Sequence, residues 1–222
     1  MTRCQYLCCG VIAGPLFVIM FLIEGATRAN YDPLRHPVSS LALGDSGWMQ
    51  VANFIVTGAL IVLFARGLWR VLRDQGYSPW GALFIACLGV GLIGAGVFPT
   101  DPVSGYPPGT PNLLPEPTMQ SQIHDLFSIG VFGGLPLACF VFTRLFARRR
   151  EWGWSVYSLV SGLGMLAAFA YAGVGFSQVS GLVDFGGLFQ RISLIAGLSW
   201  LTLLALHVLH CHRSSARLSP AS

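Results

Sequence analysis

Residues 80–98 read WGALFIACLGVGLIGAGVF and contain no charged side chain. A helix rises 1.5 Å per residue, so about 20 apolar residues cross the roughly 30 Å hydrocarbon core of a bilayer. Within lipid, a helix satisfies all of its backbone polar groups internally, which a single strand cannot do. The stretch therefore predicts a membrane-spanning helix, and it sets the fold class of the chain.

Five further stretches have the same character, with charged residues near their edges rather than their centres. The predicted spans are residues 6–23, 49–72, 80–98, 123–146, 153–174 and 188–209. The 222-residue chain is 54% hydrophobic and only 10% charged, whereas soluble domains carry about 25% charged residues. We therefore predict an all-α polytopic membrane protein, a six-transmembrane-helix bundle. It forms one domain over residues 1–212, followed by a disordered cytoplasmic tail at 213–222.

The basic residues predict the orientation. All 13 of them are arginines, and most fall on the side of the six-span arrangement that carries both termini. Arginine-rich segments favour the cytoplasmic side, so we expect the N and C termini in the cytoplasm. No small-residue cleavage site follows the first span, which we expect to be retained. The chain is thus predicted to be a multi-pass protein of the inner (cytoplasmic) membrane, with membrane lipids as partners and no nucleic acid.

Two long loops then lie outside the cytoplasm, at residues 24–47 and 99–122. Loops of this length in a compact domain are usually functional or disordered. The second loop is rich in proline, which excludes helix and favours extended, ordered turns. We therefore expect two long ordered extracytoplasmic loops.

The first loop contains Gly44-Asp45-Ser46-Gly47, which looks like the nucleophile turn of a serine protease. In such proteases the turn belongs to a β-barrel and works with a distant His and Asp. Here it links two membrane spans, and a turn before a helix explains all four residues, with Asp45 or Ser46 as the N-cap. The protease interpretation is rejected.

A histidine-rich tract ends the last span, with His207, His210 and His212 around Cys211. His207 and His210 share one helix face and could share a metal. The alternative is that these imidazoles lie favourably near a helix C-terminus beside Arg213. The second interpretation is preferred, so no metal and no cofactor are expected.

Ionisable and polar residues gather at the opposite ends of the spans. Because successive helices are antiparallel, these ends come to one membrane level, where ionisable groups are costly and indicate function by default. The expected ligand-binding residues are Glu24, Arg28, Tyr31, Asp32, Arg35, Asn53, Asp125, Gln190 and Arg191. The expected catalytic residues are His36, Ser39, Asp101 and His124. The alternative is that these charges only pair with one another and cap helices.

Glycines in the third and fifth spans recur at helical spacing. Small residues one turn apart let helix backbones approach closely in lipid. They predict a tight bundle, and they could also support a homo-oligomer through glycine-rich faces.

Several motifs in order resemble the domain of unknown function 998 family, which comprises bacterial six-helix membrane proteins. Tyr31-Asp32-Pro33 and Val38-Ser39-Ser40-Leu41 match its first outer loop; Phe98 to Asp101 and His124 match the end of its third helix and the start of its fourth. A more distant similarity, resting on Pro37-Val38-Ser39, is to the Frag/DRAM/Sfk membrane family, some of whose members are linked to lipid remodelling. The resemblance implies the architecture and no particular reaction.

These observations favour a protein that binds or processes a lipid-like or amphiphilic ligand at a polar extracytoplasmic site. In an enzyme, His36 or His124 would act as acid or base, with Asp101 or Asp32 orienting it and Ser39 as the hydroxyl. A proton-coupled transporter of a small solute is one alternative, in which Glu24 and Asp101 would carry protons. A non-catalytic membrane scaffold is another.

Overall fold

Six long helices make up almost all of the structure, a computed structural model that describes residues 2–218. The helices are α1 (Arg3–Thr27), α2 (Trp48–Asp74), α3 (Trp80–Val97), α4 (Met119–Arg148), α5 (Trp152–Phe176) and α6 (Gly186–Leu218). Two short 3-10 helices, η1 (Val38–Ala42) and η2 (Val183–Phe185), lie in the connections, and no strand forms within the described residues. All six helices are long and apolar enough to cross a membrane, so the predicted all-α six-span bundle is confirmed and the chain is a multi-pass membrane protein.

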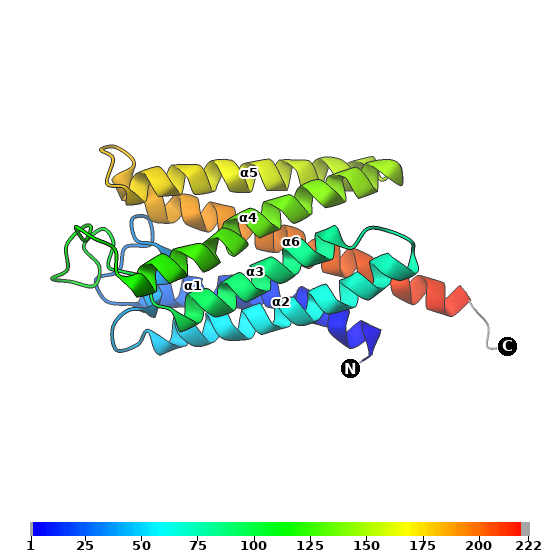
Figure 1. The fold of residues 1–222 in the computed structure, drawn as a ribbon, viewed down its shortest axis with the longest axis horizontal. Coiled ribbons are helices and arrows are strands. Elements are labelled where there is room, and N and C mark those ends of the chain that lie inside the picture. Colours follow the sequence, from blue (N-terminus) through cyan, green and yellow to red (C-terminus); the bar gives the residue numbers. More distant parts are fainter. Residues whose placement is uncertain (1, 219–222) are drawn as a thin grey trace.

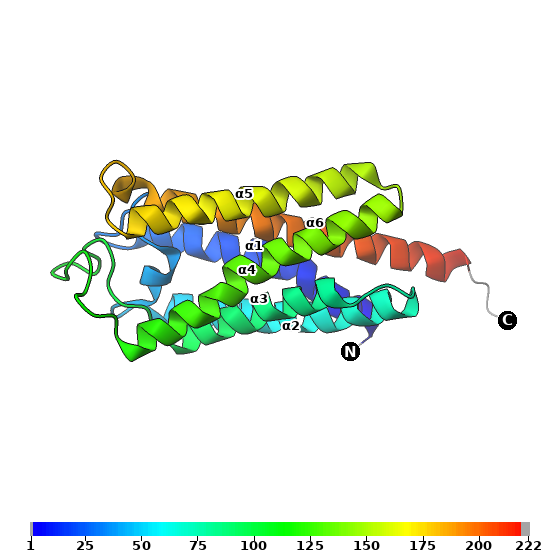
Figure 2. The same cartoon turned by 45° about the horizontal axis from the view of Figure 1, so that its top comes forward.

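The helices form a closed ring. Each packs against its neighbours in sequence, and α6 returns to pack against α1. Figures 1 and 2 show both termini at one end of the bundle and the long loops at the other. We call these the terminal end and the cap end. In both views α4 and α5 lie close together at the terminal end and diverge toward the cap end.

Side chains and tight turns define the helix boundaries. Thr2 accepts a hydrogen bond from the main-chain N–H of Gln5, whose side chain accepts one from Thr2 in return, and this capping box starts α1. Thr118 caps α4 in the same position. At the terminal end, α6 continues to Leu218. The disordered tail expected at 213–222 stays a prediction, and residues 219–222 lie outside the described part.

Glycines let neighbouring helices touch through their backbones. A Cβ added to Gly58 of α2 would lie 2.5 Å from the carbonyl oxygen of Gly89 on α3, and one added to Gly91 of α3 would lie 2.6 Å from that of Phe127 on α4. The glycines of the third span thus serve the close packing between neighbouring helices of the bundle. Association with a second copy stays a prediction, and it would have to use outward glycines such as Gly164, which has open space around it.

The terminal end carries a small polar cluster. Glu151 pairs with the guanidinium of Arg149 at 2.7 Å and lies 3.2 Å from Nε2 of His207. His207 also packs against the ring of Trp154. Among the described side chains no group of three or more His, Cys, Asp or Glu is placed to hold a metal; the side chain of His212 lies outside that set.

Candidate functional site

Three loops at the cap end interlock into one layer, which we call the cap. It consists of the first loop (residues 28–47), the second loop (98–118) and the third loop (177–185). Tyr106 of the second loop packs against two rings of the first loop, with centroids 5.2 Å from Tyr31 and 5.1 Å from His36. Arg35 of the first loop pairs with Asp184 of the third at 3.1 Å. The cap is therefore an ordered part of the fold.

Arg191, near the start of α6, holds the first loop against the bundle. Its buried guanidinium donates to the main-chain oxygens of Pro33 at 2.6 Å and His36 at 3.0 Å, and to the hydroxyl of Tyr31. That hydroxyl in turn donates to the carbonyl of Pro37 at 2.9 Å. Burial raises the pKa of Tyr31 to about 12, although the nearby guanidinium opposes the shift. Arg191 thus binds the chain's own loop.

Arg28, at the end of α1, likewise holds the first loop against the bundle. It pairs with Glu24 at 3.0 Å and donates to the main-chain oxygens of Leu43 at 3.3 Å and Ser46 at 3.0 Å. Both charged side chains are mostly buried. This pair ties α1 to the far end of the first loop and leaves neither residue on the wall of the cavity described below.

His36 is part of a local turn within the cap. Its Nδ1 accepts a hydrogen bond from the main-chain N–H of Asp32 at 2.9 Å. Burial lowers the pKa of His36, while the main chain of Ser104 and the charge of Asp32 act in the opposite direction. The carboxylate of Asp32 accepts from the N–H of Leu34 at 2.9 Å. Both residues therefore shape the loop, and their hypothesised acid–base role stays a prediction.

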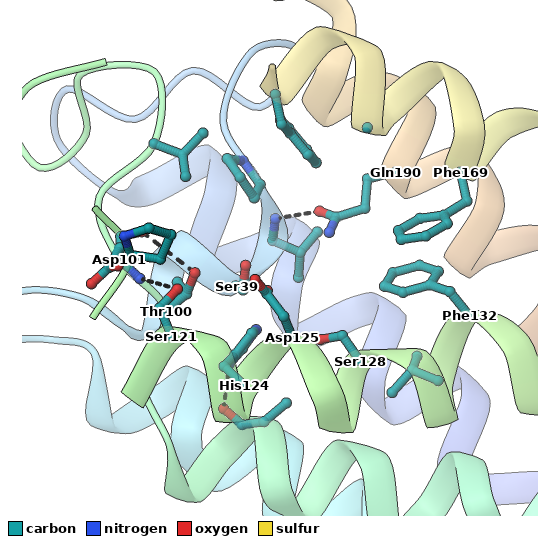
Figure 3. A pocket seen from close by; sticks show the side chains of 18 of the residues that line it. Ser39, Thr100, Asp101, Ser121, His124, Asp125, Ser128, Phe132, Phe169 and Gln190 are labelled. Atoms are coloured by element: carbon teal, nitrogen blue, oxygen red, sulfur yellow. Dashed lines mark hydrogen bonds between the residues drawn. The ribbon is translucent and has the colours of Figure 1, made fainter. Parts of the chain in front are cut away.

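Under the cap lies a cavity of about 400 Å³, lined by residues of all six helices and of the three loops (Figure 3). Its polar lining residues lie toward the cap: Ser39, Thr100, Asp101, Ser121, His124, Asp125, Ser128, Ser177 and Gln190. Apolar loop residues, among them Val103, Leu113 and Leu114, line the same end. Farther from the cap the lining is apolar, with Phe17, Phe54, Leu92, Val131, Phe132, Phe169 and Leu194. The rings of Phe132 and Phe169 stack with centroids 3.8 Å apart and join α4 to α5.

His124 is held by the main chain of α3. Its Nδ1 lies 3.1 Å from the carbonyl oxygen of Ala95 and 2.9 Å from that of Phe98, and the side chain is buried. A carbonyl only accepts hydrogen bonds, so Nδ1 carries the proton. In the neutral ring, Nε2 is then the basic nitrogen, and the ring lines the cavity.

Asp125 is the carboxylate that the fold leaves available. Figure 3 shows its side chain pointing from α4 into the cavity, on the side of Ser39. Within residues 2–218 it forms neither a salt bridge nor a side-chain hydrogen bond. Gln190 faces the same space from α6; its Oε1 accepts from the main-chain N–H of Val38 at 2.7 Å, which leaves the amide nitrogen toward the cavity.

Asp101 has a different role from the one hypothesised. Its two carboxylate oxygens accept from the main-chain N–H of Thr118 at 2.8 Å and from its hydroxyl at 2.7 Å. Its own N–H donates to the hydroxyl of Ser121 at 3.2 Å. Asp101 therefore fastens the start of α4 to the end of α3, and the imidazole of His124 is oriented by carbonyls instead.

Asn53 lies away from the cavity. Its amide donates to the carbonyl of Phe17 at 3.3 Å and to the side chain of Gln50 at 3.1 Å, which joins α2 to α1. Of the predicted site residues, the structure brings Ser39, Asp101, His124, Asp125 and Gln190 to the cavity wall. It places Glu24, Arg28, Tyr31, Asp32, Arg35, His36 and Arg191 in the supports of the cap.

Sequence reasoning missed Ser121 and Ser128, although a signal was present. With His124 and Asp125 they follow the spacing i, i+3, i+4, i+7, which puts them on one face of a helix. Sequence reasoning also missed the aromatic residues Phe132, Phe169 and Tyr106, which no comparable spacing marks in the sequence.

The comparison with protein families gives one match. The family model described as "Protein of unknown function (DUF998)" matches residues 11–207. No curated protein matches the chain, and no solved structure matches it.

Proposed function

Since the chain belongs to the DUF998 family, whose description assigns no activity, we propose a function from the geometry of the cavity. The cavity binds one amphiphilic, lipid-like ligand. The observation that carries this proposal is the change from polar to aromatic walls within one space of about 400 Å³. That volume falls in the usual range for small-molecule sites, which is roughly 300–1,000 Å³.

The walls orient the ligand. A polar head group would lie beside His124, Asp125 and Gln190, and the hydrocarbon part would extend to the stacked rings of Phe132 and Phe169. Both α4 and α5 line the cavity, and they diverge toward the cap (Figure 2). We propose that the ligand enters sideways from the bilayer between these two helices, since residues of both line the cavity.

The arginine distribution supports an extracytoplasmic position for this site. Arginine-rich segments lie at the terminal end, in the last turns of α2 and α4 and the turn that follows α4. By the bias of such segments toward the cytoplasm, the cap end would be extracytoplasmic. The protein would then act on the outer leaflet of the inner membrane.

A chemical step on the bound ligand is a second candidate function. It rests on His124, whose Nδ1 is held by two carbonyls so that Nε2 can accept a proton in the cavity. Asp125 is a free carboxylate on the same wall. Proton-coupled transport has less support, because the small space next to the cavity, which shares Leu92 and Leu194 with it, is otherwise lined by apolar residues such as Leu88 and Met165.

The experiment tests occupancy of the cavity. Gly173 of α5 borders it and has no atom within 4 Å of an added Cβ. Gly164 on the same helix is equally open and does not line this cavity. We expect Gly173→Phe to lose most of the lipid retained by the purified protein in native mass spectrometry, and Gly164→Phe to keep it.

A second variant covers the case in which the phenylalanine introduced at position 173 points away from the cavity. Ser128→Leu narrows the cavity from the α4 wall, where Ser128 faces it (Figure 3). Retention of the same lipid by both cavity variants would refute the proposal. Loss of that lipid from Gly164→Phe as well would refute it too, since the lipid would then belong to the outer surface.

A further inference from the structure

A second hollow, of about 720 Å³, lies on the outer surface between α2 and α3 near the terminal end. Three arginines of α2 line one wall: Arg66, Arg70 and Arg73. Their spacing of four and three residues puts them on one face of the helix. The opposite wall, from α3, is apolar and includes Leu83 and Ala86.

The positive charge of this groove is not balanced within the chain. Arg66 and Arg73 form no ion pair and no side-chain hydrogen bond with any residue of 2–218. Arg70 lies over the ring of Tyr6, with its guanidinium carbon 5.5 Å from the centroid. The groove has one carboxylate, Asp74, and it pairs with Arg3. Three cations therefore share a groove whose single anion is already engaged.

The apolar surface beside these cations is exposed on helices that are long and apolar enough to cross a membrane. Trp69 lies between Arg66 and Arg70 in sequence, borders the groove and is 37% exposed. Leu83 is 38% exposed on the facing helix. Tryptophan and arginine near a helix end are typical of the level of lipid head groups. A ligand here would meet cations at one end and hydrocarbon-compatible surface at the other.

We infer that this groove binds one anionic phospholipid. Its phosphate would be held by Arg66 and Arg70, since a guanidinium presents two parallel N–H donors to phosphate oxygens. An acyl chain would lie along Leu83 and Ala86. Basic pockets between membrane helices are the sites at which anionic head groups bind. The site is separate from the cap cavity and shares no lining residue with it.

Trp69 supplies a local measurement. The full-length protein is reconstituted into phosphatidylcholine vesicles that contain a small proportion of brominated phosphatidylglycerol, or the same proportion of brominated phosphatidylcholine. We expect the anionic lipid to quench fluorescence at about a 25-fold lower mole fraction, from roughly a factor of five for each of the two arginine contacts. Trp69→Phe should remove this preferential part of the quenching.

Matched variants distinguish a specific lipid-binding site from a general attraction of anionic lipid to the positive charge of the protein. Arg66→Gln/Arg70→Gln should bring the two lipids to equal quenching. Arg148→Gln/Arg150→Gln removes the same charge at the same end of the bundle, outside the groove, and should leave the preference unchanged. Excess inorganic phosphate should not compete, because it lacks the chain.

The inference would be overturned by equal quenching from both lipids in the wild-type protein. An equal loss of preference in the two double variants would overturn it as well, since that result describes net charge alone. Competition by inorganic phosphate would assign the arginines to a soluble anion and would also overturn it. All four arginines are exposed, so the variants are expected to fold, which circular dichroism checks.

Discussion

Arg191 of α6 donates a hydrogen bond to the hydroxyl of Tyr31, 160 residues earlier in the chain. Within the described residues the guanidinium has no carboxylate partner, and it is satisfied instead by this phenol and by main-chain carbonyls of the first loop and α6. A buried cation is costly unless its hydrogen bonds are made. The position of the cap therefore depends on the hydrogen bonds that the closed first loop accepts from the buried guanidinium of Arg191.

Tyr31→Phe tests that relationship. The change keeps the ring contacts with His36 and Tyr106 and removes the oxygen that accepts from Arg191. We expect the free energy of unfolding to fall by about 1–3 kcal/mol, because a buried donor loses its partner. Thermal unfolding of the purified protein measures it. Tyr171→Phe, an exposed tyrosine on α5, is the matched control and should change little; equal effects of the two substitutions would contradict the prediction.

His36 makes the cap sensitive to pH. Burial lowers its pKa from the ordinary value of 6.5, so the open loop takes up a proton more readily than the closed cap does. The contribution of neutral His36 to the stability of the closed cap is complete above pH 6.5. It declines as the pH falls from 6.5 toward the lowered pKa of the closed state. Amide hydrogen exchange of the first loop, corrected for intrinsic rates, should show weaker protection at about pH 5 than at about pH 7.5.

The control for this prediction is His36→Asn. An asparagine oxygen can accept the hydrogen bond from the N–H of Asp32 in place of Nδ1, and it does not titrate. Protection of the first loop in this variant should not depend on pH in that range. The same pH dependence in both proteins would assign the effect to another group.

The fold was predictable because membrane spans are specified locally. Uninterrupted apolar sequence and the bilayer thickness suffice to place each helix, as residues 80–98 show against the observed α3 of Trp80–Val97. The match of the family model over residues 11–207 confirms the predicted family. Helix ends differ by a few residues, since caps such as Thr118 and Thr2 set them and hydropathy does not.

The candidate site was predictable only in part. Antiparallel order brings polar helix ends to one level, and it predicted that His124, Asp125 and Gln190 lie near one another. This order does not show which charged side chains are already hydrogen-bonded to other residues of the chain. Arg191 and Asp101 look like ligand-binding or catalytic groups in sequence, yet their partners are Tyr31 and Thr118. Such pairings depend on loop conformation, which the sequence pattern does not specify.

Phe169 tests the depth of the cavity. Its ring stacks on Phe132 with planes 9° apart, and both rings line the cavity. Phe169→Ala should enlarge the cavity at this aromatic wall and shift the retained amphiphiles toward longer chains, at a cost of about 3 kcal/mol in stability. Mass spectrometry of bound lipids measures the shift. Phe84→Ala, an equal truncation at the terminal end, should leave the chain lengths unchanged; an unchanged profile in Phe169→Ala would show that hydrocarbon does not reach the stack.

Two neighbouring carboxylates on the cavity wall should respond in opposite ways to the same change. Asp101 accepts two hydrogen bonds from Thr118 at the start of α4, so Asp101→Ala should lower the free energy of unfolding by about 1 kcal/mol, as loss of a helix cap does. Asp125 makes no such contact within the described residues, and Asp125→Ala should leave the unfolding midpoint nearly unchanged. It should instead alter which head groups are retained, because that carboxylate faces the cavity. Unfolding curves and lipid profiles of the two variants, recorded side by side, check both halves. A stability loss in Asp125→Ala with wild-type lipids would place Asp125 among the supports of the fold and remove it from the ligand site.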